Sequence, residues 1–164
     1  MLKFMEEHPQ IRTFLVRACI VLGPNTRNIV TRMTELPAMF GVSGYDPPMQ
    51  FLHEEDLQRL LGWALKQQPA GIYNLAGTGT IRFSELVHCL KKRSLWLPAW
   101  LIYPALGILW KLRLMPFPPS ILDFIRYPWV GGTEKFHSTF DFPIRYSSTD
   151  ALMAFARARW PERF

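Results

Sequence analysis

Residues 11–24, IRTFLVRACIVLGP, decide the fold class of this chain. The run is rich in Ile, Val, Leu and Phe, and it ends at the turn-forming pair Gly23-Pro24. Runs of this kind are typical of strands that are buried on both faces, as they are in parallel sheets. The sequence therefore predicts a buried strand of a parallel sheet and, with helices on either side, an α/β fold.

Helical signals flank this strand on both sides. Residues 1–8 suit the last turns of a helix that stops at His8-Pro9, because a residue before proline avoids the α region. Asn25 or Thr26 is predicted to cap a helix through about Leu36, which Pro37 ends. Residues 41–48, GVSGYDPP, are turn formers. The regular structure is therefore expected to pause between residues 37 and 48.

The middle of the chain repeats the alternation of strand and helix. Residues 49–52 read as a short strand, and residues 53–67 as the clearest helix. That helix has three acidic residues in its first turn, where the helix dipole favours negative charge. Its predicted buried face carries five apolar residues at helical spacing, namely Leu57, Leu60, Leu61, Ala64 and Leu65.

The pattern continues toward the C-terminus. Residues 72–76 read as another strand, followed by a GTGT loop and a helix capped by Ser84 that runs to about Lys92. Ser147 and Asp150 form a capping-box pattern ahead of a last helix. The apolar segment 95–119 is broken by prolines, so we expect short helices around a groove or against a partner.

Composition limits the class of protein. The 164 residues are 49% apolar and 14% aromatic, which suits one domain with a packed core, covering residues 1–164. Lys and Arg number 19 against 13 acidic residues, so the net charge is +6. That charge permits attraction to nucleic acid, anionic lipid or a phosphorylated ligand without selecting one.

Neither a targeting signal nor a metal site is expected from this sequence. The first ten residues carry charges at Lys3, Glu6 and Glu7 and no secretory pattern. The longest apolar run, residues 95–110, is shorter than the ~20 residues of a membrane-spanning helix. The two cysteines indicate neither a disulfide framework nor a zinc site. We expect a cytoplasmic protein without a metal site.

Three short motifs favour structural interpretations. Gly77-x-Gly79-x-x-Arg82 has arginine where a dinucleotide-binding loop needs its third glycine, so the Rossmann glycine loop is absent. Gly41-x-Ser43-Gly44 is one residue short of a nucleophile elbow. The acids after His53 serve the helix dipole better than they would a metal. The small basic groups near helix ends need no nucleic acid as a partner.

The order of five segments resembles the C-terminal half of an extended short-chain dehydrogenase/reductase of the NAD-dependent epimerase/dehydratase type. The matching segments are RACIVLGPN at 17–25, QFLHEEDL at 50–57, GIYNLAG at 71–77, SEL at 84–86 and YSSTDAL at 146–152. The resemblance implies short parallel strands with flanking helices, arranged as the substrate-binding lobe of a Rossmann-like enzyme.

The resemblance also implies parts that this sequence lacks. Members of the family carry a glycine-rich NAD(P)-binding half and a catalytic Tyr-x-x-x-Lys. None of the five tyrosines here has a lysine four residues on. Hydride transfer requires a bound nicotinamide and a proton donor. We therefore expect no catalytic residue in this chain, no tight binding of NAD or NADP to it alone, and no activity without a partner.

Site residues carried over from the resemblance fall in two groups. The backbone of Ala18, Cys19, Ile20 and Val21 would face the nicotinamide of an intact enzyme. Asn28, Arg32 and Gln50 would border a small-molecule substrate, although Arg32 fits a solvated surface charge equally well.

Two departures from the family pattern bear on the substrate. Gln50 stands where many sugar-nucleotide enzymes place an arginine, and an amide offers no charged fork for a diphosphate. Residues 132–135, GTEK, replace the usual Asp-Thr-Ser-Arg. The apolar segment 95–119 suggests a sterol-like or isoprenoid alcohol instead, or docking to a bilayer; it could also simply cover the sheet.

Several partners and roles remain open. The start of the chain resembles a cut, which fits a truncated gene, an internal start or a split enzyme with a separate Rossmann half. A remnant of two or three parallel strands should leave an edge and an apolar face uncovered, which favours self-association. The alternatives are a stand-alone binding module and, less favoured, a peripheral membrane protein that uses Trp96, Trp100 and Trp110 at the interface.

Overall fold

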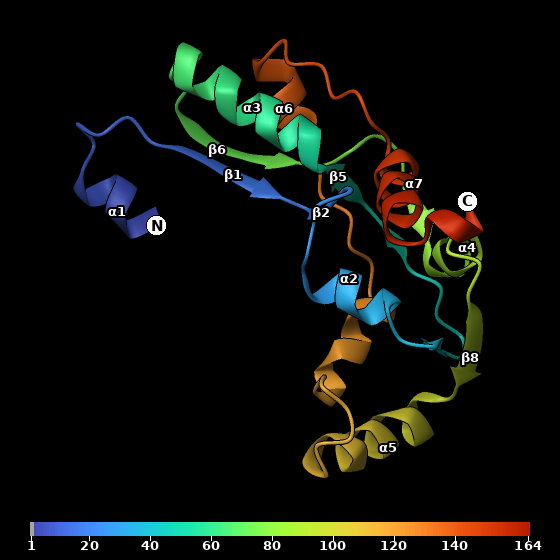
Figure 1. Ribbon diagram of the computed structural model, residues 1–164. Helices are drawn as coiled ribbons and strands as arrows, with labels where there is room; N and C mark the ends of the chain where they lie inside the picture. The colour runs from blue at the N-terminus through green and yellow to red at the C-terminus, as the bar shows by residue number, and fades with distance from the viewer. Residues whose placement is uncertain (1) are drawn as a thin grey trace.

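The computed structural model describes residues 2–164 and shows an α/β fold built from short strand pairs (Figure 1). Three pairs are parallel and one is antiparallel. The parallel pairs are β1 (Phe14–Ala18) with β6 (Gly71–Leu75), β2 (Ile20–Leu22) with β5 (Phe51–His53), and β3 (Ala38–Val42) with β8 (Arg93–Leu97); the antiparallel pair is β4 (Pro48–Met49) with β7 (Ile81–Arg82). The expectation of short parallel strands with flanking helices is confirmed.

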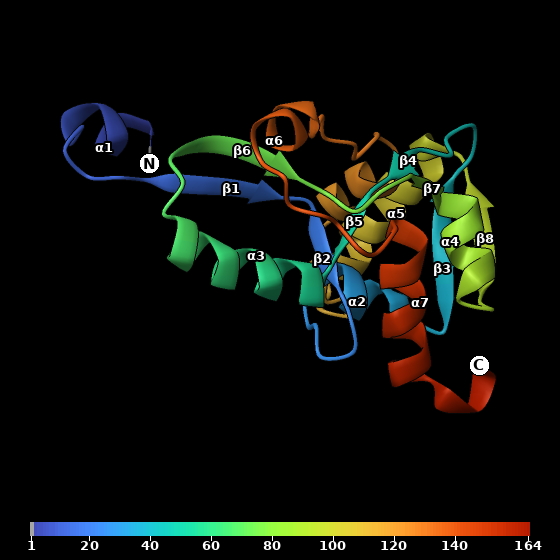
Figure 2. The same cartoon turned by 90° about the horizontal axis from the view of Figure 1, so that it is seen from above.

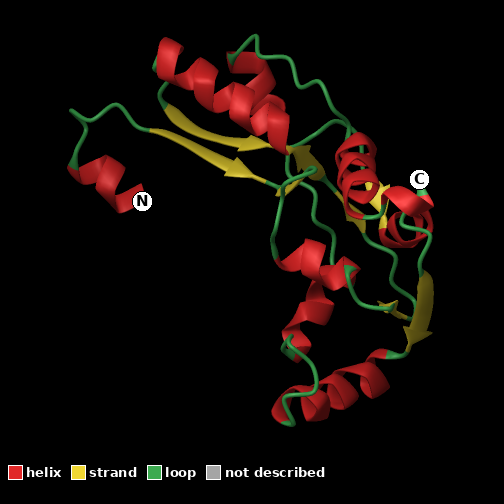
Figure 3. Cartoon of the chain, in the orientation of Figure 1, coloured by secondary structure: helices red, strands yellow, loops and turns green. Residues whose placement is uncertain are grey.

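Nine helical segments connect and cover these strands within the described residues (Figure 3). The α-helices are α1 (Leu2–Glu7), α2 (Ile29–Thr34), α3 (Glu54–Gln67), α4 (Phe83–Cys89), α5 (Ala99–Lys111), α6 (Glu134–Thr139) and α7 (Ser148–Arg159). Two 3₁₀ helices, η1 (Pro119–Ile125) and η2 (Pro161–Arg163), complete the set. Seen from above, β1, β6 and α3 extend to one side of the body that contains α4, α7, β3 and β8 (Figure 2).

The predicted strand at residues 11–24 is divided in two at Cys19. The Cys19 N–H donates to the Leu75 carbonyl at 2.9 Å, and beyond it the chain changes partner from β6 to β5. The prediction that this strand is buried on both faces is wrong for β1, where Arg17 and Ala18 are exposed. The reason is that Phe14 and Val16 pack against buried side chains, whereas Arg17 and Ala18 lie at an open cleft.

Helix α7 begins as its sequence predicts. The Ser147 hydroxyl accepts a hydrogen bond from the Asp150 N–H at 3.1 Å, and the Asp150 carboxylate accepts one from the Ser147 N–H at 2.9 Å. This reciprocal capping box satisfies two N–H groups that would otherwise lack partners at the helix start. The burial of the Ser148 side chain, which is bonded to the Phe51 N–H, then holds the helix against β5.

Two other predicted helix starts are wrong. The cap of α2 is Asn28, because Asn25 and Thr26 donate their side-chain hydrogen bonds to the Glu54 carboxylate instead. Helix α4 begins at Phe83, and the predicted cap Ser84 lies inside it. Both the N–H and the hydroxyl of Ser84 donate to Asp46 at 2.8 Å. In each case a carboxylate distant in sequence redirects a capping side chain.

The pairing of β3 with β8 was missed by the sequence pattern. The loop expected from residue 37 contains β3, and the apolar segment 95–119 begins with the end of β8 before it forms α5 and the start of η1. Gly41 and Trp96 explain the pairing. A Cβ at Gly41 would lie 2.5 Å from the Trp96 ring, so the missing side chain makes room for the indole.

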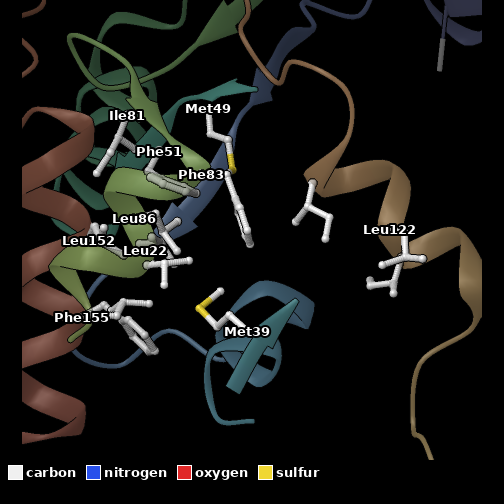
Figure 4. Close-up of a cluster of buried hydrophobic side chains, with 14 of the residues drawn as sticks. Leu22, Met39, Met49, Phe51, Ile81, Phe83, Leu86, Leu122, Leu152 and Phe155 are labelled. Atoms are coloured by element: carbon white, nitrogen blue, oxygen red, sulfur yellow. The ribbon is translucent and has the colours of Figure 1, made fainter. Parts of the chain in front are cut away.

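Two clusters of buried side chains form the core. The larger joins β2, β3, β5, α4, α5, η1 and α7, and Figure 4 shows part of it around Leu22, Phe51 and Phe83. The smaller lies between α3, β6 and residues 136–144, around Leu60 and Phe136. The predicted buried face of α3 is only partly correct, because Leu61 and Leu65 are 54% and 81% exposed.

Candidate functional site

An open cleft of about 500 Å³ lies beyond the carboxyl ends of β1 and β6. In open α/β sheets, ligands bind outside the carboxyl ends of the strands, so this position is the first place to expect a site. We call it the strand-end cleft. Its lining comes from four parts of the chain: Arg17, Ala18, Cys19 and Ile20; Gln50; Asn74 and Leu75; and Phe124, Pro128, Trp129, Val130, Gly131 and Thr133.

Four of the seven site residues carried over from the sequence line this cleft. Ala18, Cys19 and Ile20 form one wall, and Gln50 lies on the same cleft although it is distant in sequence. Val21 is half-buried against the smaller core cluster and does not line the cleft. The remaining two residues, Asn28 and Arg32, also lie outside its lining.

Asn28 is occupied by backbone groups. Its Oδ1 accepts from the N–H groups of Val30 and Thr31 at 3.0 Å, and its Nδ2 donates to the Val21 carbonyl at 2.8 Å. The side chain thus ties the start of α2 to the end of the strand region. In this arrangement Asn28 fixes the backbone at the start of α2 and lies outside the lining of the cleft.

Arg32 is exposed and lies over an aromatic ring. Its guanidinium carbon is 5.5 Å from the centre of the Phe117 ring, a distance typical of cation–π contact. The contact joins α2 to the segment between α5 and η1. Arg32 is therefore directed toward that segment and away from the strand-end cleft.

Two amide side chains hold the third wall of the cleft. Gln50 Oε1 accepts from the Gly131 N–H at 3.0 Å, and the backbone N–H of Gln50 donates to the Trp129 carbonyl at 3.0 Å. Asn74 Nδ2 donates to the Gly132 carbonyl at 3.0 Å. Together they fix residues 129–132 across the strand ends. Sequence reasoning missed this wall, and the available signal was the turn-forming Gly131-Gly132 beside Trp129.

Cys19 lines the cleft, but its side chain packs against the smaller core cluster and its thiol is not reactive. Burial raises the pKa of this thiol to about 12, even though backbone groups of Gly77 and Cys19 itself act in the opposite direction. A thiolate is the nucleophilic form of cysteine, and it is scarce at neutral pH when the pKa is this high. Cys19 therefore contributes a small neutral wall to the cleft. Both cysteines are free thiols.

A second, apolar cavity of about 110 Å³ lies beneath α5. Every residue around it is apolar: Met33, Leu36, Met39, Phe40, Phe83, Leu97, Ile102, Ala105, Leu106, Leu109, Met115, Phe117, Ile121, Leu122 and Ile125. In Figure 4, Met39 and Phe83 lie on one side of the gap and Leu122 on the other. Apolar cavities of about 150 Å³ stay dry and bind benzene-sized molecules.

A small space of about 20 Å³ shares lining residues with both sites. It shares Phe124 and Trp129 with the strand-end cleft, and it shares Met33, Met39, Phe83 and Ile125 with the apolar cavity. Phe124 and Trp129 meet edge to face, with ring centres 4.2 Å apart. This aromatic pair therefore separates a cleft with polar groups from an apolar interior.

Polar groups outside the cleft serve the fold. Asp56 is fully buried and accepts hydrogen bonds from Arg59 at 2.6 Å and from the N–H groups of Arg145 and Tyr146. His53 caps α3 through its Nδ1 and stacks on the Tyr146 ring. These contacts agree with the structural interpretation of residues 53–56. The described residues contain no cluster of three or more metal-ligating side chains.

Comparison with known proteins gives a likeness of fold. No family model matches the sequence, and no curated protein matches it. Among solved structures, dTDP-glucose 4,6-dehydratase from Bacillus anthracis in complex with NAD is 14% identical, with a TM-score of 0.63. UDP-glucuronic acid 4-epimerase from Bacillus cereus in complex with NAD is 13% identical, with a TM-score of 0.62.

Human epimerase family protein SDR39U1 with NADPH is also similar, at 19% identity and a TM-score of 0.58. The match to the dehydratase covers 98% of this chain and 48% of that structure. The match to the UDP-glucuronic acid 4-epimerase covers 97% and 47%, and the match to the human protein covers 89% and 48%. This chain thus spans about half their length. It has the α/β fold of part of the NAD-dependent epimerase and dehydratase structures.

Proposed function

We propose that this chain is the substrate-binding half of an NAD(P)-dependent oxidoreductase of the epimerase/dehydratase type, and that it is inactive alone. One observation carries the proposal. The backbone expected to face a nicotinamide, at residues 18–20, lines the same cleft as Gln50, the residue expected to border the substrate. Solved structures of the same partial fold, several of them complexes with NAD or NADPH, support this assignment.

The chain offers room for the nicotinamide end of the cofactor, but its loop after β6 offers no cradle for the pyrophosphate. A phosphate cradle needs free backbone N–H groups in a glycine-rich loop. Here the Gly77 N–H donates to the Phe51 carbonyl at 2.8 Å, and a Cβ at Gly77 would lie 2.4 Å from that carbonyl oxygen. The loop after β6 is therefore filled by the chain itself. In the proposal, a partner half holds the dinucleotide and supplies hydride chemistry.

The residues of this chain bind and orient. Gln50 and Asn74 hold residues 129–132 in place, Cys19 presents an uncharged wall, and the exposed Arg17 gives the cleft a positive charge. Neither amide can donate a proton as a general acid at neutral pH. The proton donor of the proposed reaction therefore belongs to the partner half.

The proposed substrate is an alcohol or ketone with an apolar body. Its polar group would lie in the strand-end cleft, and its apolar part would extend past Phe124 and Trp129 toward the cavity beneath α5. Gln50 favours this class over a nucleotide sugar, because its Oε1 is already bonded to Gly131 and it offers no charge to a diphosphate.

A homologous series of 2-alkanones tests the substrate site, with the bound positions read from backbone amide NMR shifts. We expect shifts at Cys19, Gln50 and Gly131, and, for the longer ketones, at Met39 and Ile121 as well. Affinity should rise by about fourfold for each added methylene until the cavity is filled. Saturating ketone that leaves the amides of the cleft unmoved would contradict the site.

Titration with NADH tests whether the cofactor-binding site belongs to a partner half. The isolated chain should show no saturable change in tryptophan or nicotinamide fluorescence at micromolar concentrations of NADH. A micromolar dissociation constant, or oxidation of an alcohol by the chain alone with NAD or NADP, would overturn the proposal that the cofactor site belongs to another half.

A further inference from the structure

Helix α5 presents an apolar stripe to solvent. Trp100, Leu101 and Ile108 are 76%, 43% and 60% exposed, and Pro104 and Ala105 between them are exposed too. These positions follow helical spacing, so they lie on one face, opposite the buried Ile102 and Leu106. Leu112 and Leu114 continue the exposed apolar surface beyond the helix. We call residues 100–114 the α5 arm.

The charge of this region is of one sign. The sequence has no acidic residue between Glu85 and Asp123, while Lys111 and Arg113 lie within the α5 arm and are exposed. Neither cation takes part in an ion pair with any described residue. An apolar surface with unpaired cations at its end complements a partner that is both apolar and negatively charged.

The helix is too short to cross a bilayer. Its 13 residues span ~20 Å at 1.5 Å per residue, against a hydrocarbon thickness of ~30 Å. None of the helices between residues 2 and 164 is long and apolar enough to span a membrane. A helix with this composition fits the interface plane, where tryptophan rings and aliphatic side chains enter the boundary between headgroups and acyl chains.

The surroundings of α5 bear on its occupant. Figure 1 places α5 away from β1 and α1, but β8, which leads directly into α5, also pairs on one edge alone within the described residues, so open strand edges do not assign the arm to a partner half. A second copy docked arm to arm about a two-fold axis would bring the cationic end of one arm against another part of the other arm. Neither arm has an acidic residue to pair with Lys111 and Arg113, whereas an anionic lipid surface supplies that charge.

We propose that the α5 arm docks on an anionic bilayer surface. Trp100, Ile108 and Leu114 enter the interface, and Lys111 and Arg113 lie at the headgroups. Trp110, 47% exposed, follows Ile102 and Leu106 at helical spacing and therefore lies outside the stripe. Trp96 takes no part, because its ring packs against Gly41 and Phe83. This docking does not depend on the proposed enzymatic role, since it uses a different face of the molecule.

Co-sedimentation with lipid vesicles tests the docking. The full chain should pellet with vesicles of phosphatidylcholine and phosphatidylserine, and much less with phosphatidylcholine alone. The double substitution Trp100→Ser with Ile108→Ser should lower the partition coefficient by about tenfold or more. Leu65→Ser is the matched apolar control, because Leu65 is exposed on α3, far from the arm, and its loss should leave the partition coefficient unchanged.

The charges have their own variants. Lys111→Gln and Arg113→Gln should each weaken binding by about fivefold at low salt, and added salt should remove that difference. Lys66→Gln on α3 is the control for net charge. Far-UV circular dichroism checks that each variant keeps its fold.

Three outcomes would overturn the docking proposal. The first is a wild-type chain that stays in the supernatant with anionic vesicles. The second is a Trp100→Ser, Ile108→Ser variant that pellets as well as wild type. The third is a dimer in solution that this same double substitution dissociates, which would assign the arm to a second copy of the chain.

Discussion

At the scale of single residues, the hydrogen-bond partners of a polar side chain show whether it holds the backbone or remains open to a ligand. Asn28 was expected to border the substrate, yet its oxygen caps α2 and its amide nitrogen is bonded to the Val21 carbonyl. Gln50 also holds backbone, but it does so on the wall of the strand-end cleft. The residue types alone could not distinguish these two amides.

Substituting Asn28 separates its two tasks. Asn28→Asp keeps the cap oxygen but loses the donor to Val21, so we expect a loss of about 1–2 kcal/mol in the free energy of unfolding. Asn28→Ala loses both tasks and should cost about 2–3 kcal/mol. Urea unfolding measures both values. An Asp variant as stable as wild type would show that the bond to Val21 adds nothing.

Glu54 gives the chain a predictable acid sensitivity. Burial acts to raise the pKa of this carboxyl group, but hydrogen bonds from Thr26 and Asn25 outweigh it, so the folded-state pKa lies below the ordinary value of 4.5. The resulting stabilisation is complete above the unfolded-state pKa and is lost as the pH falls through the folded-state pKa.

Comparison of wild type with Glu54→Gln tests this expectation. The wild-type chain should be the more stable at pH 7, and the difference should shrink below about pH 4.5, as the carboxylate takes up a proton. Urea midpoints measured from about pH 3 to about pH 7, a range that includes the titration of carboxyl groups, supply the test. A stability difference between wild type and Glu54→Gln that does not change with pH would contradict a stabilising role for the hydrogen bonds from Asn25 and Thr26 to the ionised carboxylate.

At the scale of elements, the sequence predicts what local bonds stabilise and fails where distant contacts decide. Helices α3 and α7 carry strong local signals, the acidic first turn and the capping box, and both are confirmed. Strands β3 and β8 pair across more than 50 residues. The glycine at position 41 made the sequence of β3 look like a loop, whereas in the structure the Trp96 ring occupies the space beside Gly41. Propensity cannot register such a pairing.

Two glycine substitutions test the close packing of elements. A Cβ at Gly77 would press on the Phe51 carbonyl oxygen, so Gly77→Ala should destabilise the chain by about 2–3 kcal/mol. Gly62 in α3 has open space around it, and Gly62→Ala should stabilise the chain by about 0.5–1 kcal/mol through helix propensity. Thermal unfolding compares them, and shifts of the same sign in both variants would refute the packing argument.

At the scale of the whole molecule, the candidate site is a meeting of distant segments. The resemblance identified residues 18–20 and 50, but not Asn74 or the wall at residues 128–133, which depends on hydrogen bonds from Gln50 and Asn74. The apolar cavity likewise needs α2, β3, α5 and η1 together. Sequence reasoning could supply the strand ends and the apolar composition, while the walls follow from tertiary contacts.

The flank of α3 should drive self-association of the isolated chain. Leu61 and Leu65 are exposed beside Phe14 and Pro69 in an open hollow, next to the unpaired edge of β1. Burying this surface would remove apolar area from water, and a strand edge readily pairs with another chain.

We therefore expect reversible dimers at concentrations of about 100 µM, and Leu61→Gln with Leu65→Gln should raise the dissociation constant at least tenfold. Sedimentation velocity measures this constant, and Ile108→Gln on α5 is the control that should leave it unchanged. A wild-type chain that remains monomeric throughout this concentration range would show that the α3 flank and the strand edge do not bind a second copy.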